Sequence, residues 1–396
     1  MARRSKPRLR ICAVTSTRAD WGHVLPLLRV LKADPAFELK LLVTGQHLTR
    51  DAGESRRAIN KDGFIVNATV DMGLGGDDTP AAVSAALGRC IAGIGKALAR
   101  LKPDLLLILG DRYEILGAAT AATLARIPIA HCCGGDITEG AIDDSMRHAI
   151  SKMSHVHFVT NAASGSRLSQ MGEDPARVFV VGSSGIELIR SLRLMTRKAF
   201  FSSVGLEAGK KNVIVTFHPE TLADDSMSDC REMLEALDRL GPDVGLLFCG
   251  SNADVGGRAV ERMVKGFVRT HPNAVFHASL GSLRYISGLE HCDVVVGNSS
   301  SGLYEAPTLQ TPTVNIGGRQ AGRLRAKSVI DVPAERGAIS KAIKRAMDMD
   351  CSGLKNPYGD GRASDKMLRA LKRALDRTGW DPSRLLIKKF MSWPPA

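Results

Sequence analysis

The stretch LLLILGDRYEILGAATAATLARIPIAHC, residues 105–132, decides the fold of this chain. It joins two apolar runs, residues 105–109 and 127–132, through a longer segment in which apolar residues recur at helical spacing. Short apolar runs that alternate with helical segments are typical of βαβ units, in which helices cover both faces of a parallel sheet. We therefore predict an α/β fold.

The same alternation continues in both directions along the chain. Further strands are expected at residues 9–15, 39–44, 156–160 and 178–181, and a second series begins afresh at residues 213–217, 244–249, 274–277, 294–296 and 313–316. With 396 residues, the chain is long for one domain. We predict two Rossmann-like, doubly wound domains, residues 1–190 and 200–365.

Polar residues gather where the predicted strands end, which is where ligands bind in such sheets. Six segments carry them: Thr17-Arg18-Ala19-Asp20, Gly110-Asp111-Arg112-Tyr113-Glu114, His131-Cys132-Cys133-Gly134-Gly135-Asp136, Phe217-His218-Pro219-Glu220, Gly250-Ser251-Asn252 and Gly297-Asn298-Ser299-Ser300-Ser301-Gly302. Each segment alone is also typical of an ordinary turn or helix cap. Six together, in both domains and with acids, arginines and histidines mixed, indicate a ligand site in a cleft that the domains face.

Charge and cysteine content disfavour several classes of protein. The net charge is +13, but residues 1–10 carry five of the excess positive charges, and residues 361–396 carry nine basic against three acidic residues. The body is therefore close to neutral, and we expect no nucleic-acid partner.

Eight cysteines without a C-x-x-C pair indicate a reduced, cytoplasmic protein. A signal-peptide core and a long apolar run are both missing from the sequence, so no membrane span is expected.

The predicted second domain holds candidates for binding a phosphorylated ligand. Residues 297–302, GNSSSG, lead into a helical stretch at 303–309, and small residues before a helix allow its first N–H groups to bind phosphate. Glu305 is placed to accept hydrogen bonds from a ribose, and Arg319 and His218 to contact a diphosphate. A helix cap, a surface arginine and a structural histidine are the ordinary alternatives for these residues.

The predicted first domain holds the candidate acids and bases. Asp111 and Arg112 end a fully apolar strand, where a carboxylate can exchange protons and an arginine can bind phosphate. A helix over residues 142–153 places Asp143 with Arg147, and Asp144 with His148, on one face. Ordinary helix caps and surface ion pairs are the alternatives.

The histidines and cysteines near the strands predicted at residues 127–132 and 156–160 do not indicate a metal site. His131, Cys132 and Cys133, taken with His148, His155 and His157, fit no standard ligand spacing. A Gly-x-Gly-x-x-Gly motif does not follow the first strand either, which argues against a dinucleotide site. We expect neither a metal nor another cofactor.

Taken together, these motifs resemble the UDP-N-acetylglucosamine 2-epimerase family over residues 9–330, and most closely its hydrolysing branch, which supplies sialic- and legionaminic-acid-type sugar synthesis. The resemblance implies the GT-B architecture, with a C-terminal segment, residues 366–396, returning to the first domain. It implies release of UDP and N-acetylmannosamine from UDP-N-acetylglucosamine through a glycal intermediate, or the same reaction on the 2,4-diacetamido-2,4,6-trideoxy analogue, with no cofactor. UDP would be bound by Arg18, Arg112, His218, Asn252, Ser299, Ser300, Glu305 and Arg319.

In the same resemblance Asp111 and Asp143 are catalytic acids or bases, and His131 and Asp144 line the sugar pocket. Cys133 stands where several family members carry a glutamate, which makes Asp136 our candidate for the second face of C2. The segment Thr138-Glu139-Gly140-Ala141 is similar to members that act on the diacetamido sugar.

Three other functions remain compatible with the sequence. A non-hydrolysing 2-epimerase would interconvert the two nucleotide sugars, and a GT-B glycosyltransferase would need an acceptor. A non-catalytic nucleotide-sugar sensor would bind without turnover. A homo-oligomer, either a dimer or a tetramer, is compatible with each of them.

Overall fold

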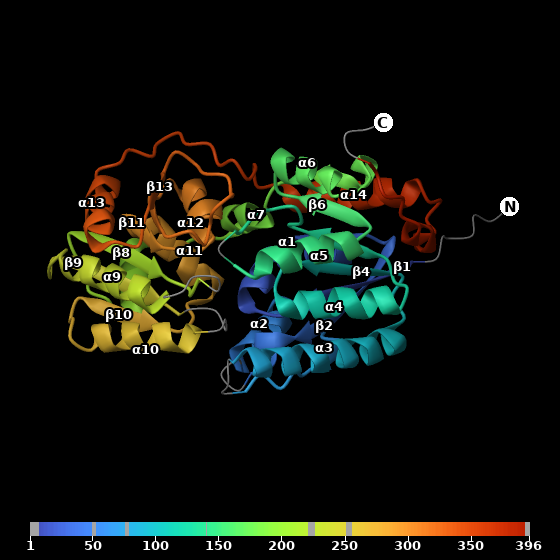
Figure 1. Ribbon diagram of the computed structural model, residues 1–396, viewed down its shortest axis with the longest axis horizontal. Helices are drawn as coiled ribbons and strands as arrows, with labels where there is room; N and C mark the ends of the chain where they lie inside the picture. Colours follow the sequence, from blue (N-terminus) through green and yellow to red (C-terminus); the bar gives the residue numbers. More distant parts are fainter. Residues whose placement is uncertain are drawn as a thin grey trace. The chain divides into compact units, whose positions relative to one another are not determined.

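The chain divides into two compact α/β units in a computed structural model that describes residues 8–49, 53–75, 79–139, 141–220, 226–250 and 256–392. The first unit comprises residues 1–136, 143–188 and 359–396, and the second comprises residues 137–142 and 189–358. Residues 137–142, which lie between β5 and α5 in the chain, are thus grouped with the second unit. Figure 1 shows the strands and helices of both units.

The first unit is built on a seven-stranded parallel sheet in the order β3-β2-β1-β4-β5-β6-β7. Its strands are β1 (Leu9–Thr15), β2 (Phe37–Thr44), β3 (Ala68–Val70), β4 (Leu105–Leu109), β5 (Ile129–Cys132), β6 (Val156–Val159) and β7 (Val178–Val180). All five residues of β4 are buried, as its unbroken apolar sequence predicts for a strand covered on both faces. The order reverses between β1 and β4, which is the switch point of a doubly wound sheet.

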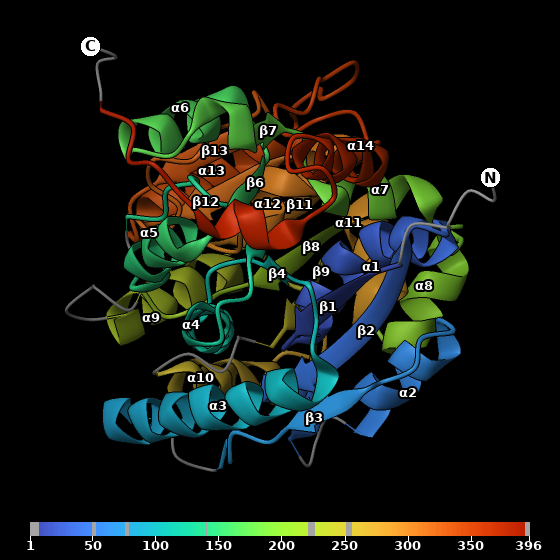
Figure 2. The same ribbon diagram turned by 90° about the vertical axis from the view of Figure 1, so that its right-hand side faces the viewer.

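Helices cover both faces of this sheet (Figure 2). They are α1 (Arg18–Ala33), α2 (Gly53–Lys61), α3 (Pro80–Leu101), α4 (Tyr113–Leu124), α5 (Asp143–Met153), α6 (Ala162–Gln170) and α14 (Ala363–Asp376), with 3-10 turns η1 (Gly45–Leu48), η3 (Pro175–Arg177) and η5 (Pro382–Leu386). One core joins α1 and α14 to the sheet, and another joins α3, α4 and α5 to its other face. The C-terminal helix α14 therefore packs in the first unit, through residues such as Met367, Leu371 and Leu375.

The second unit has a six-stranded parallel sheet in the order β10-β9-β8-β11-β12-β13. Its strands are β8 (Lys211–Thr216), β9 (Val244–Cys249), β10 (Ala274–His277), β11 (Val294–Gly297), β12 (Thr313–Ile316) and β13 (Val329–Val332). Its helices are α8 (Arg197–Val204), α9 (Ser226–Asp238), α10 (Gly257–Val268), α11 (Gly281–His291), α12 (Ser301–Tyr304) and α13 (Arg336–Met347), with the 3-10 turn η4 (Ala306–Leu309). The remaining helix, α7 (Ser184–Ser191), leads from the first unit into the second. One face packs on α9, α10 and α13, and the other on α8 and α11.

The predicted strands are all present, and their ends differ from the expectation by at most two residues. Two edge strands, β3 and β13, were not predicted. The helix expected at residues 303–309 is instead two short pieces, α12 and η4, that meet at Glu305. Pro307 accounts for the break, because proline has no N–H to continue an α-helix.

Helix α3 is the one described helix that is long and apolar enough to cross a membrane by length and composition alone. Ser84, Arg89 and Lys96 interrupt its apolar residues, so no unbroken apolar run marks this helix in the sequence. Five of its residues, among them Cys90, Ile94 and Leu98, belong to the core of the first unit. A core helix of a compact domain passes the same test, so this observation is weak evidence for a membrane span.

Candidate functional site

A buried guanidinium holds two carboxylates beyond the carboxyl ends of β4 and β5. Arg147 on α5 is 1% exposed, and its Nη2 donates to the carboxylate of Asp111, which follows β4. Its Nη1 donates to Asp144 Oδ1 at 3.0 Å and to the main-chain oxygen of Asp136 at 2.9 Å. The side chains of Asp111 and Asp144 are 22% and 24% exposed. The first unit therefore presents two carboxylates that are paired with a buried cation and are still partly accessible.

The helix face that carries this cluster was predicted, but its central contact was not. Asp144 and His148 form the expected pair, with Nε2 and Oδ2 3.4 Å apart. Burial lowers the pKa of His148, although Asp144 opposes that shift. Asp143, the first residue of α5, is half-buried. Arg147 reaches a carboxylate 36 residues away in the sequence, and this contact follows only from the packing of α5 beside α4 and β5.

His131 lies at the end of β5 with both ring nitrogens in contact with protein groups. The side chain is 0% exposed, Nε2 lies 2.8 Å from the carbonyl oxygen of Gly110, and Nδ1 lies 3.3 Å from Ser151 Oγ. Burial lowers the pKa of His131 to about 4. The imidazole is therefore neutral near pH 7, and it holds the carbonyl of the residue that precedes Asp111.

Asp136, our candidate for the second face of C2, is 5% exposed. One of its carboxylate oxygens accepts hydrogen bonds from Thr160 Oγ1 at 3.0 Å, from Asn161 Nδ2 at 3.4 Å and from Ser164 Oγ. This carboxylate thus ties the loop after β5 to the start of α6. The geometry suits an anchor of the loop better than a group that exchanges protons with a ligand.

The residue at the glutamate position of several family members, Cys133, adopts a left-handed backbone with φ of 68°. Burial raises the pKa of its thiol well above the ordinary value, and neighbouring Cys132, Asp136 and Asp111 add to the shift. The thiol is therefore protonated at neutral pH. All eight cysteines of the chain are free thiols.

Arg112 is bound within the protein to a carboxylate that the sequence analysis did not single out. Its Nε lies 3.2 Å from Glu114 Oε2, and the Arg112 side chain is 12% exposed while Glu114 is 0% exposed. Burial raises the pKa of Glu114, and Arg112 opposes that shift. An arginine next to a buried carboxylate offers only part of its guanidinium to a ligand.

In the second unit an asparagine joins the ends of β8, β11 and β12. Asn298 Oδ1 accepts from the main-chain N–H of His218 at 2.8 Å, and its Nδ2 donates to the main-chain oxygen of His218 at 2.8 Å. The main-chain oxygen of Asn298 accepts from Arg319 Nη1 at 3.2 Å and from Gln320 Nε2 at 2.8 Å. Two predicted ligand residues, His218 and Arg319, are thus brought to one asparagine.

Strand β11 needs a glycine as its last residue, before the turn that follows. Gly297 has a φ of 132°, and a Cβ there would lie 2.0 Å from the main-chain oxygen of Thr216 on β8. Ser299 and Ser300 follow half-buried, and Glu305 is 6% exposed. Helix α12 has only four residues, so Ser300 is the residue before its start and Glu305 the residue after its end, whereas the sequence predicts Glu305 within a longer helix over residues 303–309.

The loop after β12 is held by an acid and by the segment at residues 137–142. Glu220 Oε1 accepts the main-chain N–H of Arg319 at 3.0 Å, and burial raises the pKa of Glu220. Arg323, further along the loop, donates to the main-chain oxygen of Ile137 at 3.0 Å and to Thr138 Oγ1 at 2.8 Å. The chain between β5 and α5 thus contacts the same loop that carries Arg319.

Two predicted ligand residues, Asn252 and the side chain of Arg18, lie outside the described residues. Within the described ranges no group of three or more histidine, cysteine, aspartate or glutamate side chains is arranged to hold a metal ion.

A cavity of about 570 Å³ in the second unit is lined by Glu220, Asp229 and Asp331. Its acidic lining does not suit a diphosphate.

Comparison with known proteins agrees with these motifs. The family model described as UDP-N-acetylglucosamine 2-epimerase matches residues 29–372. A Campylobacter jejuni protein named GDP/UDP-N,N'-diacetylbacillosamine 2-epimerase (hydrolyzing) is 36% identical over 81% of this chain and 84% of its own length. A Legionella pneumophila protein named UDP-N,N'-diacetylbacillosamine 2-epimerase (hydrolyzing) is 33% identical over 92% of this chain and 95% of its own.

Solved structures share the fold. The UDP-GlcNAc 2-epimerase of Methanocaldococcus jannaschii, crystallised with UDP-GlcNAc and UDP, matches with a TM-score of 0.79 at 17% identity, over 92% of this chain and 99% of that one. This likeness, with the two parallel sheets, confirms the predicted α/β architecture of the GT-B type.

Proposed function

The chain belongs to the UDP-N-acetylglucosamine 2-epimerase family, and from this premise we propose that it is a hydrolysing 2-epimerase of UDP-linked 2-acetamido sugars. The observation that carries the proposal is the cluster in which buried Arg147 pairs with partly exposed Asp111 and Asp144. The reaction needs carboxylates that contact a sugar, and this cluster supplies two of them in fixed positions.

The chemistry explains why such a site is needed. The C2–H bond of a nucleotide sugar has no neighbouring carbonyl and is not acidic. The C1–O bond breaks first, its electron pair goes to the departing UDP, and the oxocarbenium-like centre at C1 makes the C2 proton acidic. A carboxylate removes that proton, and a C1=C2 double bond forms. Water then adds its oxygen to C1 and loses a proton, while an acid protonates C2 from the opposite face and releases the manno sugar.

Asp111, Asp143 and Asp144 are the residues proposed to act on the sugar, since each carboxylate is partly exposed at the start of α5 or the end of β4. Neutral His131 contributes by fixing the main chain before Asp111. Asp136 contributes by anchoring the loop after β5.

The second unit is proposed to bind UDP. His218 and Arg319 donate to the diphosphate, and Asn298 sets their positions through its contacts with both. The turn with Ser299 and Ser300 lies next to them. The other proposed UDP ligands are Arg18, Arg112, Asn252 and Glu305.

Two substrates are candidates, UDP-N-acetylglucosamine and its 2,4-diacetamido-2,4,6-trideoxy analogue. We favour the diacetamido sugar, because both hydrolysing relatives described above are named for it. Eight free thiols support a reducing cytoplasmic location.

Proton NMR of the purified protein in D2O with each nucleotide sugar, without metal or acceptor, tests the proposal. The expected products are UDP and a free manno sugar with deuterium at C2. Formation of the manno nucleotide sugar without UDP would identify a non-hydrolysing epimerase. Survival of both substrates would refute epimerase activity on them and would favour an acceptor-dependent transferase or a sensor.

A further inference from the structure

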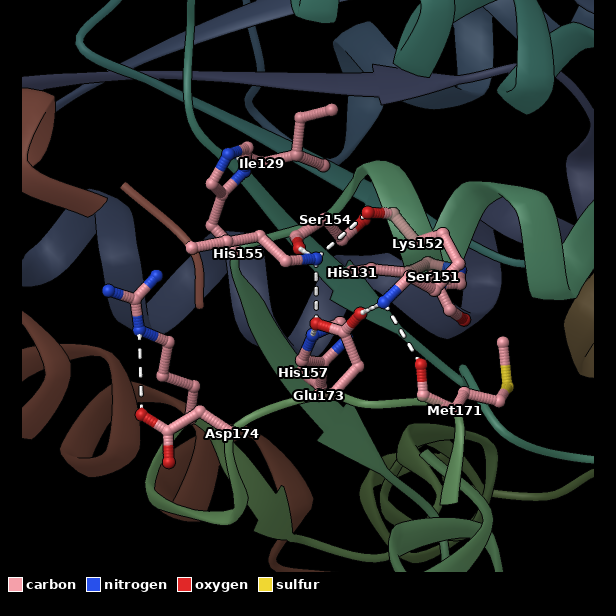
Figure 3. A network of polar contacts seen from close by, with 12 residues as sticks. Ile129, His131, Ser151, Lys152, Ser154, His155, His157, Met171, Glu173 and Asp174 are labelled. Carbon is pink, nitrogen blue, oxygen red and sulfur yellow. Dashed lines mark hydrogen bonds and ion pairs between the residues drawn. The ribbon is translucent and has the colours of Figure 1, made fainter. Parts of the chain in front are cut away.

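A buried carboxylate in the first unit, outside the candidate site described above, contacts two lysines and a histidine. Glu173 follows α6 and is 2% exposed. Its Oε1 lies 2.6 Å from Lys152 Nζ, and its Oε2 lies 2.7 Å from Lys388 Nζ and 3.0 Å from His157 Nε2. Figure 3 shows Glu173 between His157 and the end of α5.

Lys388 places all three of its ammonium hydrogens within this network. Besides Glu173, Nζ donates to the main-chain oxygen of Lys152 at 2.8 Å and to that of Ser154 at 2.6 Å. These carbonyls lie at the C-terminal end of α5, where the last four carbonyls of a helix have no partner within the helix. A cation there also offsets the negative end of the helix dipole.

Lys388 comes from residues 385–391, which we call the C-terminal strap; the strap begins with the last two residues of η5 and has no helix or strand beyond them. Arg177 donates to the main-chain oxygens of Leu385 and Ile387 at 2.8 and 3.0 Å, and Met391 N donates to Gly172 O at 3.0 Å. These contacts hold the strap on both sides of Lys388. Its position is therefore defined by several elements of the first unit.

The same helix carries the candidate catalytic residues at its other end. Asp143 and Asp144 open α5, Arg147 follows within one turn, and Lys152 lies in its last turn. An α-helix of eleven residues is about 16 Å long and moves as a rod, so a displacement at one end shifts the other. Groups that react with a substrate tolerate such shifts poorly.

We propose that the C-terminal strap fixes the position of α5 in the first unit. Lys388 is thereby a positioning residue for the Asp111 and Asp144 carboxylates, which Arg147 on the same helix contacts. The effect on turnover rests on the proposed function, whereas the effect on α5 does not. Burial lowers the pKa of Lys388, and the contact with Glu173 opposes that shift.

Two neighbouring lysines provide a matched test in the full-length protein. Lys388→Met removes the ammonium and keeps most of the stem. Lys389→Met makes the same change at an exposed residue whose side chain has no hydrogen bond or ion pair within the described part of the chain. Lys388→Arg restores a cation. The measurements are kcat and KM by NMR, and hydrogen exchange of peptides that cover α5.

We expect Lys388→Met to speed exchange in the last turn of α5 and to lower kcat about tenfold at nearly constant KM, with partial recovery in Lys388→Arg. Lys389→Met should match the wild type. Unchanged exchange in α5, or faster exchange with an unchanged kcat, would overturn the proposal. A wild type without epimerase activity would refute the proposed function, and the exchange data would still decide whether Lys388 holds α5.

Discussion

Replacing Arg147 with methionine tests the core of the candidate site. The guanidinium is 1% exposed and donates to two carboxylates and one carbonyl, so its removal leaves three acceptors without that partner. Breaking a buried ion pair by removing one partner costs about 3–5 kcal/mol. Because Asp111 and Asp144 are 22% and 24% exposed, water can partly replace the lost contacts, and we expect about 3 kcal/mol of lost unfolding free energy.

Arg147→Met should lower the kcat of the folded protein itself, and not only the fraction of the protein that is folded. Without Arg147 the carboxylates of Asp111 and Asp144 repel each other and leave their positions, so kcat should fall by about a factor of 100 or more even in fully folded protein. Urea denaturation measures the stability, and the NMR assay measures kcat well below the transition.

A control and a double variant make this prediction refutable. Arg100→Met changes an exposed arginine on α3 and should alter the unfolding free energy by less than about 0.5 kcal/mol. Arg147→Met combined with Asp111→Asn removes both charges, and should cost less than the sum of the single changes. Additive costs, or an Arg147→Met variant with near-normal kcat, would refute the reasoning.

Three further predictions concern single residues. Gly297→Ala should destabilise the protein in urea by about 2 kcal/mol or more and weaken UDP binding measured by calorimetry, because its Cβ would lie 2.0 Å from a main-chain oxygen; an unaltered midpoint would contradict this. Burial lowers the pKa of both His131 and His155 from 6.5 to about 4. As the pH drops from 6.5 towards 4, these histidines are protonated in the unfolded state but not in the folded state, so the unfolding free energy should fall. His155→Asn should flatten that slope in urea titrations, and a slope equal to the wild type's would rule out this source. Asp136→Asn keeps a hydrogen-bond acceptor and should retain most of kcat if Asp136 is an anchor, whereas Asp111→Asn should lose about 100-fold; equal losses would make Asp136 a proton-transferring group.

Most of the fold followed from local patterns. The run at residues 105–109 is apolar at every position and too short for a typical helix, so it indicates a strand buried on both faces, and the structure has it as β4. The edge strand β3 was missed because three residues, Ala68–Val70, carry too little pattern to distinguish a strand from a loop. The helix expected after Gly302 was too long because Pro307 was not taken into account.

The candidate site was predictable only in part. Asp111 and His218 lie at strand ends, and strand ends are visible in the sequence as the points where apolar runs stop. The sequence does not show whether a carboxylate at a strand end is accessible to a ligand. Asp111 and Asp136 both follow strands, yet the side chain of Asp111 is 22% exposed and Asp136 is 5% exposed. The difference comes from Thr160 and Ser164, which fold back over Asp136.

The sequence by itself determined the order of strands and helices, the strand ends that hold polar residues, and the family, because these depend on neighbouring residues and on spacing. Only the tertiary structure decided which of those residues meet. The pairing of Arg147 with Asp111 closes 36 residues of chain, and the pairing of Lys388 with Glu173 joins the C-terminal strap to the loop after α6. Contacts of this kind depend on how helices pack on the sheet, and no periodicity along the chain encodes them.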